Sequence, residues 1–265
     1  AMFADGGFRD NVLLSGVNSI NWARIMAQTV YYFTTALALG APGRKVDFCV
    51  PTGNFGDIFA GHVARHMGLP MGDLVVATNI NDILHRTMET GRYEVLGVEA
   101  TQSPSMDIQV SSNFERLLFE ACGKDAGHLS TLMAGLKQSG SFTLRDDMRD
   151  YISSGFASGR TSEAETADII RTTLAETGEL LDPHTAVGYG VARARARQDV
   201  PMVTLATAHP AKFPDAVEAA CGVRPALPER LGDLMQRPER FDVLANDLSA
   251  VMQFIQERTR AGNAS

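Results

Sequence analysis

Two glycines, Gly53 and Gly56, lie between a short apolar run and a segment of helical pattern, in the stretch PTGNFGDIFAG at 51–61. Glycine lets the backbone adopt positive φ and approach a ligand closely. The first N–H groups of a helix lack intrahelical partners, and the positive end of the helix dipole points the same way. We therefore predict that this turn binds a phosphate group through backbone N–H groups.

The G-x-x-G spacing limits which phosphate ligands the turn suits. It matches neither the G-x-G-x-x-G pattern of dinucleotide-binding folds nor the G-x-x-x-x-G-K-[ST] pattern of nucleoside-triphosphate loops. Spacing alone also allows an ordinary strand-to-helix turn, in which Asp57 is merely a favourable acid at a helix N-terminus.

A second polar cluster, NSINWAR at 18–24, opens the first long helical pattern. Asn18, Ser19 and Asn21 precede or begin the helix, and Arg24 follows one turn later. Such a cluster can bind a second phosphate or a carboxylate. The alternative is a capping Ser19 followed by a surface arginine.

The histidines could bind a metal or act as acids and bases, but the sequence favours neither role. His62 and His66 have the i, i+4 spacing of metal ligands, but no third ligand is apparent in the sequence, so we expect a helix surface and no metal. His184 in DPHTAVG and His209 in TAHPAKF could act as acids or bases. We expect both to make structural hydrogen bonds instead.

The elements that must position these residues alternate along the chain. Short apolar runs at 46–50, 74–78 and 203–206 have the composition of buried parallel strands. Helical patterns are predicted at 18–39, from 57 to 67, from a cap at Asn79 or Asn81 to Gly91, and at 183–197 and 214–220. This order predicts an α/β fold in three αβα layers around a mainly parallel sheet.

Other segments depart from this alternation. Residues 113–180 read as a helical insertion, within which 156–158 is compatible with a short strand. Residues 1–17 read as a short helix and a turn, and the tail at 226–262 as two helices. Asp182 or Thr185 is expected to cap the helix at 183–197. Its final arginines, Arg193, Arg195 and Arg197, are expected to be solvated.

Composition excludes several classes of function. The chain has 265 residues, 45% apolar, with a net charge of −7, which disfavours binding to nucleic acid or acidic membranes. Cys49, Cys122 and Cys221 form no disulfide or metal pattern, which favours a reducing, cytoplasmic location. No membrane span or signal pattern is evident. Because the sequence begins at Ala1, we interpret it as the interior of a longer chain.

Six segments in order carry a family resemblance: NSINWARIMAQ, VPTGNFGDIFAGHVARHMGLP, TNINDILHR, SPSMDIQVSSNFERLLFE, LDPHTAVG and ATAHPAKF. Together they resemble threonine synthase of the bacterial and fungal type over about residues 15–220. The resemblance implies a pyridoxal-phosphate (PLP) enzyme with the fold type II of the tryptophan synthase β subunit. It also implies a carbon–oxygen lyase that converts O-phospho-L-homoserine and water to L-threonine and phosphate.

The same resemblance assigns roles to residues. The cofactor phosphate is expected to bind the turn formed by Gly53, Asn54, Phe55, Gly56 and Asp57. Thr207 is expected to hydrogen-bond the pyridine nitrogen of the cofactor. The substrate phosphate is expected to bind Asn18, Ser19 and Arg24, with Asn54 nearby.

One departure from the family concerns the Schiff-base lysine, which lies there in a Phe-Lys-Asp-type motif. None of the lysines of this chain, Lys45, Lys124, Lys137 and Lys212, has that context. The resemblance therefore places the lysine upstream of Ala1. Residues 1–265 would be the C-terminal large PLP-binding domain, with no catalytic residue of its own and no activity alone. Whether the protein is a monomer or a dimer stays open.

Two alternatives remain at this stage. One is another PLP lyase of the same fold, such as an amino-acid dehydratase. The substrate-phosphate cluster around Arg24 argues against it. The other is a non-catalytic domain similar to threonine synthase that keeps only its anion sites.

Overall fold

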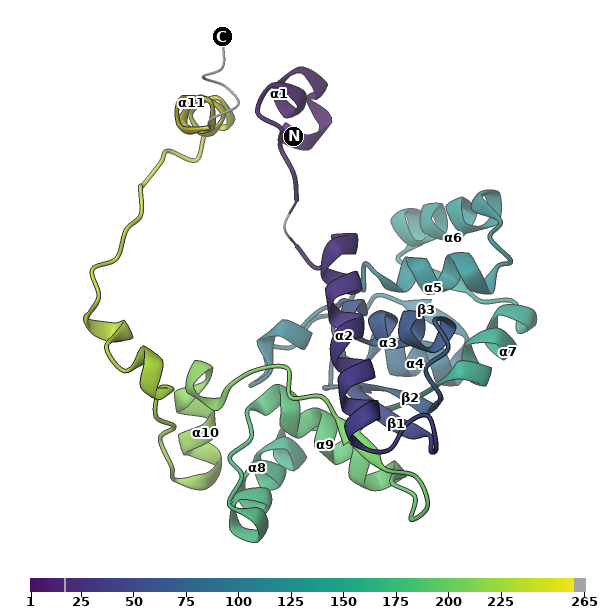
Figure 1. Ribbon diagram of the computed structural model, residues 1–265. Coiled ribbons are helices and arrows are strands. Elements are labelled where there is room, and N and C mark those ends of the chain that lie inside the picture. The colour runs from purple at the N-terminus through teal and green to yellow at the C-terminus, as the bar shows by residue number, and fades with distance from the viewer. Residues whose placement is uncertain (17, 260–265) are drawn as a thin grey trace. The chain divides into compact units, whose positions relative to one another are not determined.

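The computed structural model describes residues 1–16 and 18–259, and these form two compact units. One unit, Trp22–Leu227, contains the main sheet (Figure 1). The other comprises the described residues of Ala1–Asn21 and Pro228–Ser265. Predictions that extend to residue 17 or to 260–262 lie outside the described residues.

The main sheet has four strands in the order β5-β2-β1-β6. All of its pairings are parallel. The strands are β1 (Val46–Pro51), β2 (Met71–Thr78), β5 (Phe156–Arg160) and β6 (Met202–Thr204). Their carboxyl ends therefore meet at one edge of the sheet, where ligands of open α/β folds bind. The predicted parallel α/β fold is confirmed.

Helices cover both faces of this sheet (Figure 1). Along β1, Phe48 and Val50 belong to the larger core, with residues of α2 (Trp22–Ala38) and α3 (Gly56–His66). Cys49 lies on the opposite face in a smaller core with α9 (Pro183–Arg195). Successive side chains of a strand point to opposite faces, so this alternation yields the predicted three layers.

Two further helices complete the layer that contains α9. α8 (Glu163–Thr177) packs against both α9 and α10 (Pro214–Cys221). Ile170 of α8, Ala186 of α9 and Val217 of α10 are fully buried together. This layer carries the N-terminus of α9 to the carboxyl edge of the sheet.

The segment between β2 and β5 forms a mainly helical region beside the sheet. It contains α4 (Ile83–Thr90), β3 (Arg92–Glu94), α5 (Phe114–Ala121), α6 (Ala126–Ser139), β4 (Ser141–Thr143) and α7 (Asp146–Gly155). The antiparallel pair β3–β4 was not predicted; Tyr93 stacks on Phe142 across it, with ring centroids 4.8 Å apart. β5 then returns the chain to the main sheet, so the predicted helical insertion is divided by a strand of that sheet.

Some predicted helix ends are wrong. α2 begins at Trp22, later than the predicted start at Asn18. The N-cap of α4 is Asp82, not Asn79 or Asn81. Both asparagine side chains donate instead to Asp107 Oδ1, at 2.8 and 2.9 Å. Asparagine competes for such local contacts as readily as it caps helices, and short-range pattern does not decide between the two.

The unit formed by the chain ends is simpler. It contains the 3₁₀ turn η1 (Met2–Ala4) and α1 (Gly6–Asn11), then η4 (Glu229–Leu231), η5 (Leu234–Gln236) and α11 (Leu248–Arg258). The prediction of two helices in the tail is wrong, because its described part forms one α-helix and two 3₁₀ turns. Pro228 and Pro238 interrupt helical hydrogen bonding there. Within the described chain, no helix combines the length and apolarity needed to cross a membrane.

Candidate functional site

Residues 52–57 connect β1 to α3 at the carboxyl edge of the sheet. Thr52 fixes the start of this turn: its N–H donates to the carbonyl of Ala77 at 2.8 Å, and its hydroxyl to that of Val50 at 2.6 Å. Phe55 then adopts φ 61° and forms the N-cap of α3. Its buried ring packs against Phe114 and Phe156, with centroids 5.2 and 5.7 Å away. The buried ring holds a residue other than glycine in the left-handed conformation that the turn requires.

The turn offers unpaired backbone donors. The N–H groups of residues 53–58 donate to no acceptor among the described residues. The carbonyl of Asn54 accepts from the backbone N–H of Asn113 at 3.1 Å and from its side-chain amide at 2.9 Å. A run of free N–H groups at a helix N-terminus, with the adjacent carbonyl already paired, is a donor set that fits a phosphate.

A second loop lies directly over this turn. A Cβ atom on Gly53 would lie 2.6 Å from the carbonyl oxygen of Ser105, closer than side-chain carbons approach other atoms. The hydroxyl of Ser111 also donates to the Gly53 carbonyl at 2.8 Å. Position 53 therefore needs glycine because the loop containing Ser105 packs on it, which the sequence did not show.

His184, near the N-terminus of α9, supports that loop. Its Nε2 lies 3.3 Å from the backbone nitrogen of Ser105, and its Nδ1 lies 3.1 Å from Asp182 Oδ1. Since the Ser105 N–H must donate, Nε2 is the acceptor and the ring proton belongs on Nδ1. The ring also packs against Phe213, at a centroid distance of 4.8 Å. His184 makes the structural hydrogen bonds that the sequence led us to expect.

Asp182 is the N-cap of α9, one of the two caps predicted. Its Oδ1 accepts from the backbone N–H groups of His184 and Thr185, at 2.9 and 3.4 Å. Its other oxygen accepts a very short bond from the Thr185 hydroxyl. Burial alone would raise the pKa of Asp182, but hydrogen bonds from His184 and Thr185 lower it overall. The carboxylate is therefore ionised and anchors His184.

Asp57 lies in the first helical turn of α3, but its side chain contacts α2. The hydroxyls of Tyr31 and Tyr32 both donate to Asp57 Oδ1, the Tyr32 bond being 3.2 Å and the Tyr31 bond shorter. Burial raises the pKa of Asp57, and the hydrogen bonds from both tyrosines only partly oppose the rise. Asp57 can thus offer a phosphate its backbone N–H, while its carboxyl group contacts α2.

Thr207 follows β6, the strand that pairs with β1 on the side away from β2. Cys49 of β1 pairs with Thr204 of β6, and the N–H of Leu205 donates to the Cys49 carbonyl at 3.0 Å. The turn at 52–57, called the phosphate turn after its predicted ligand, and the exposed Thr207 therefore follow neighbouring strand ends. The strand order reverses between these two strands, which is the point where open α/β sheets bind ligands.

The residues predicted to hold a substrate phosphate are divided between the units. Asn18 and Ser19 belong to the unit of the chain ends, and Arg24 and Asn54 to the unit with the sheet. Asn18 Oδ1 accepts from the N–H of Ile20 at 3.0 Å, and Asn54 Oδ1 accepts from the Ser112 hydroxyl at 3.1 Å. Their joint role stays a prediction.

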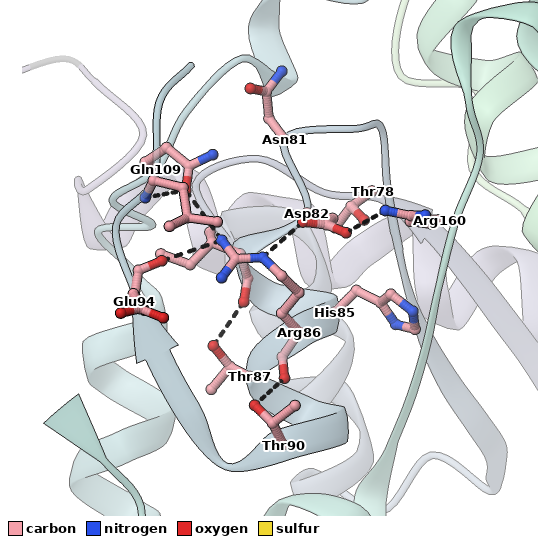
Figure 2. A network of polar contacts seen from close by, with 12 residues as sticks. Thr78, Asn81, Asp82, His85, Arg86, Thr87, Thr90, Glu94, Gln109 and Arg160 are labelled. Carbon is pink, nitrogen blue, oxygen red and sulfur yellow. Dashed lines mark hydrogen bonds and ion pairs between the residues drawn. The ribbon is translucent and has the colours of Figure 1, made fainter. Parts of the chain in front are cut away.

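A polar network at the end of β2, shown in Figure 2, was not predicted from the sequence. Asp82 pairs with Arg86 at 2.8 Å and with Arg160, at the end of β5, at 2.9 Å. Arg86 also donates to the Glu94 carbonyl at 3.1 Å and to Gln109 at 3.3 Å. The network ties the carboxyl ends of β2 and β5 to Glu94, which precedes the loop that contains Ser105, and to Gln109, which follows it. A polar run directly after a strand was its only signal in the sequence.

The prediction that His62 lies on a helix surface is wrong. His62 is buried, with its Nε2 2.7 Å from Glu120 Oε2, so α3 has no simple solvent-facing histidine pair. Arg195 and Arg197 are exposed, as predicted, but each also has a partner: Arg197 forms an ion pair with the fully buried Asp47 at 2.8 Å, and Arg195 donates to the Ser158 carbonyl at 2.7 Å. Both partners are distant in sequence, so local pattern gave no sign of them.

His209, by contrast, makes the kind of local bond that was expected. Its Nδ1 accepts from the backbone N–H of Ala211 at 3.1 Å and caps the 3₁₀ turn η3 (Pro210–Lys212). This turn links the Thr207 loop to α10, so His209 shapes that loop, and no hydrogen bond among the described residues joins it to the turn at 52–57.

Fold and site together define the class: an α/β protein with a turn rich in backbone N–H donors at the switch point of a parallel sheet. Comparison with known proteins narrows this class. The family model described as "Threonine synthase, C-terminal" matches residues 185–255. Threonine synthase from Pseudomonas aeruginosa is 53% identical over 264 residues, covering 99% of this chain and 56% of that protein. The chain thus spans a little over half the length of this curated relative.

Solved structures give the same result. The chain superposes with a TM-score of 0.94 on PLP-bound threonine synthase from Brucella melitensis, at 61% identity, covering 98% of this chain and 56% of that one. For threonine synthase from yeast the TM-score is 0.86 at 37% identity, with the same two coverages. The resemblance to threonine synthase that the ordered motifs predicted is confirmed by sequence and by fold.

Proposed function

We propose that this chain is the portion of a threonine synthase that holds the phosphate of PLP. The unpaired N–H groups of residues 53–58, at the N-terminus of α3, carry the proposal. They suit a group that is anionic and bound without a covalent bond to this turn. The PLP-bound relative from Brucella melitensis supports the choice of this phosphate ligand.

The residues of this chain would position the cofactor rather than transform it. Gly53, Asn54, Phe55, Gly56 and Asp57 would bind its phosphate through backbone N–H groups. Thr207, at the neighbouring strand end, would donate a hydrogen bond from its neutral hydroxyl to the pyridine nitrogen and keep its proton, so that nitrogen would carry no positive charge. PLP itself supplies the electron sink for reactions at the carbon atoms of amino acids.

For the whole protein we propose conversion of O-phospho-L-homoserine and water to L-threonine and phosphate. Asn18, Ser19 and Arg24, with Asn54, would hold the phosphate of the substrate. An arginine at the beginning of a helix suits such a group, because its guanidinium pairs with phosphate oxygens in the favourable field of the helix end. A substrate that carries a phosphate requires a second anion site beside that of the cofactor, whereas an unphosphorylated amino acid does not.

The lysines of the chain do not supply the covalent attachment of the cofactor in this proposal. Lys45 directly precedes β1, at the opposite edge of the sheet from the phosphate turn. Lys124 follows α5, and Lys137 lies in the last turn of α6. Lys212 alone follows a strand at the carboxyl edge, and its amine lies 5.8 Å from the centre of the Phe213 ring. The attachment lysine would belong to sequence outside these 265 residues.

The test uses the whole protein that contains this sequence. With phosphohomoserine, we expect equal molar release of threonine and inorganic phosphate, and no consumption of serine or threonine. Consumption of serine or threonine instead would identify an amino-acid dehydratase. Binding of PLP without any turnover would identify a non-catalytic anion-binding protein.

The 265-residue chain permits a second test. After incubation with PLP and reduction with borohydride, we expect no stable adduct on Lys212, as judged by mass spectrometry of proteolytic peptides. Inorganic phosphate should nevertheless bind, observed as chemical-shift changes of the Gly53 and Gly56 amides. A reduced Lys212 adduct that supports turnover would overturn the assignment of the lysine to other sequence.

A further inference from the structure

Two helices extend from the phosphate turn to a second polar cluster. α3 begins at Gly56 and ends with His62 and His66 in its last two turns. α5 follows Asn113, which binds the Asn54 carbonyl, and has Glu120 in its last turn. The two helices contact each other, so their far ends bring two imidazoles and one carboxylate together. One potential ligand atom from each residue lies within 4.8 Å of the other two.

The orientation of His66 leaves one nitrogen available. Its Nδ1 lies 3.0 Å from the carbonyl oxygen of His62, and since a carbonyl can only accept, Nδ1 carries the proton. The lone pair is therefore on Nε2, and the residue is exposed. A histidine whose second nitrogen donates to a backbone carbonyl is the usual arrangement of a metal ligand.

Glu120 brings negative charge to the cluster. Its Oε2 lies 2.7 Å from His62 Nε2 and accepts from the Tyr151 hydroxyl at 3.1 Å.

We propose that His62, His66 and Glu120 form a binding site for a divalent cation of the zinc type. Two imidazole nitrogens and one carboxylate oxygen are ligands that Zn²⁺ prefers, and a water molecule would complete four-coordination. The cation would replace the proton shared by His62 Nε2 and Glu120. That proton would move to His62 Nδ1, which has no hydrogen-bond partner among the described residues and so breaks no existing bond.

The cation would act as a clamp between α3 and α5. The other ends of these helices are already joined at the phosphate turn, by the Asn113–Asn54 hydrogen bonds and the packing of Phe55 on Phe114. A metal ion would fix the far ends as well, and Tyr151 would extend the connection to α7. The site is independent of the proposed enzymatic activity, because none of its ligands lies in the phosphate turn.

The test is a titration of the tag-free, metal-free protein with Zn²⁺, followed by calorimetry, and with Co²⁺, followed by visible absorption. We expect one ion per chain and a Co²⁺ spectrum of a four-coordinate site. His66→Ala and Glu120→Gln should each weaken Zn²⁺ binding about tenfold or more. His128→Ala, on α6, is the matched control and should bind like the unaltered protein.

Thermal unfolding gives an independent readout. Zn²⁺ should raise the melting temperature of the unaltered protein and of His128→Ala, and leave that of His66→Ala unchanged. Because His66 is exposed, the alanine variant should fold, which circular dichroism would verify. Absence of stoichiometric binding, or equal affinity in His66→Ala, would overturn the proposal. Neither result bears on phosphohomoserine turnover.

Discussion

The Nε2 atom of His184 lies 3.3 Å from the backbone nitrogen of Ser105, and this contact joins two parts of the site that are far apart in sequence. Ser105 packs over Gly53 in the phosphate turn, while His184 is fixed by Asp182 at the start of α9. The position of the loop over the turn therefore depends on a histidine that would not itself contact the phosphate.

This relationship predicts different effects for two substitutions of His184. Gln offers an oxygen that can accept from the Ser105 N–H, whereas Phe fills the space without an acceptor. We expect His184→Phe to lose about 1 kcal/mol of phosphate-binding free energy, the net value of one hydrogen bond, which is roughly a fivefold weaker affinity. His184→Gln should retain most of it. Phosphate titration of both variants measures the difference, and equal affinities would contradict the role given to the hydrogen bond.

Gly53→Ala tests the close packing between the turn and the loop. The added Cβ would meet the Ser105 carbonyl at 2.6 Å, so the backbone of one segment must move. We expect a loss of about 1–3 kcal/mol in stability, as is typical for overpacking, together with weaker phosphate binding. Gly97→Ala is the matched control, because a Cβ there has nothing within 4 Å. Urea unfolding of the two variants decides the question; equal midpoints would mean that the loop yields freely.

Asp57 and Asp182 should respond oppositely to pH. The folded-state pKa of Asp57 is raised, so its ionised form opposes folding at neutral pH, and this cost disappears as pH falls through the folded pKa. The folded-state pKa of Asp182 is lowered, so its contribution is present above the unfolded pKa of about 3.9 and is lost as pH falls below it.

Asparagine variants separate the two carboxyl groups. Asp57→Asn keeps an oxygen for Tyr31 and Tyr32, so we expect its free energy of unfolding at pH 7 to equal or exceed that of the unaltered protein. Asp182→Asn should lower that free energy at pH 7 by about 1–2 kcal/mol, because a charged N-cap is lost. Its deficit should shrink toward pH 3. Chemical unfolding from pH 3 to 7 measures both, and a deficit independent of pH would refute the assignment to Asp182.

Local pattern was sufficient to predict the strands β1 and β2 and the turn between β1 and α3. Apolar runs of buried strands are visible in one short window, and so are the glycines of the turn. The ordered motifs also predicted Thr207 as a site residue, and the pairing of β6 with β1 places it at the adjacent strand end.

The tertiary contacts that support the site could not be predicted from local pattern. The contact between His184 and Ser105 joins residues 79 positions apart, and the His62–Glu120 contact joins residues 58 apart. No window of sequence contains both partners, and each residue alone has an ordinary local explanation. The packing of Ser105 on Gly53 depends likewise on tertiary structure, since the glycine alone indicates only a turn.

Arg197 provides the last prediction, and it follows from a residue that sequence pattern placed in solvent. Asp47 in β1 is fully buried, and both of its oxygens lie within 2.9 Å of Arg197 Nη2. Removing the arginine leaves a buried carboxylate whose remaining donor, among the residues that the structure describes, is the N–H of Asp73 at 2.7 Å. We expect Arg197→Ala to lower the free energy of unfolding, because the buried Asp47 carboxylate then loses the charged partner that both of its oxygens contact.

Arg193 gives the comparison for this substitution. Arg193 lies four positions before Arg197 in the sequence. Its ion-pair partner, Glu176, is 3.9 Å away, and the side chains of Arg193 and Glu176 are both exposed. Arg193→Ala should therefore change the free energy of unfolding by about 0.5 kcal/mol or less. Adding Asp47→Asn to Arg197→Ala should recover part of the loss, because the buried group is then uncharged. If Arg193→Ala and Arg197→Ala are equally stable in urea, the ion pair between Arg197 and Asp47 does not stabilise the packing of the segment after α9 on β1.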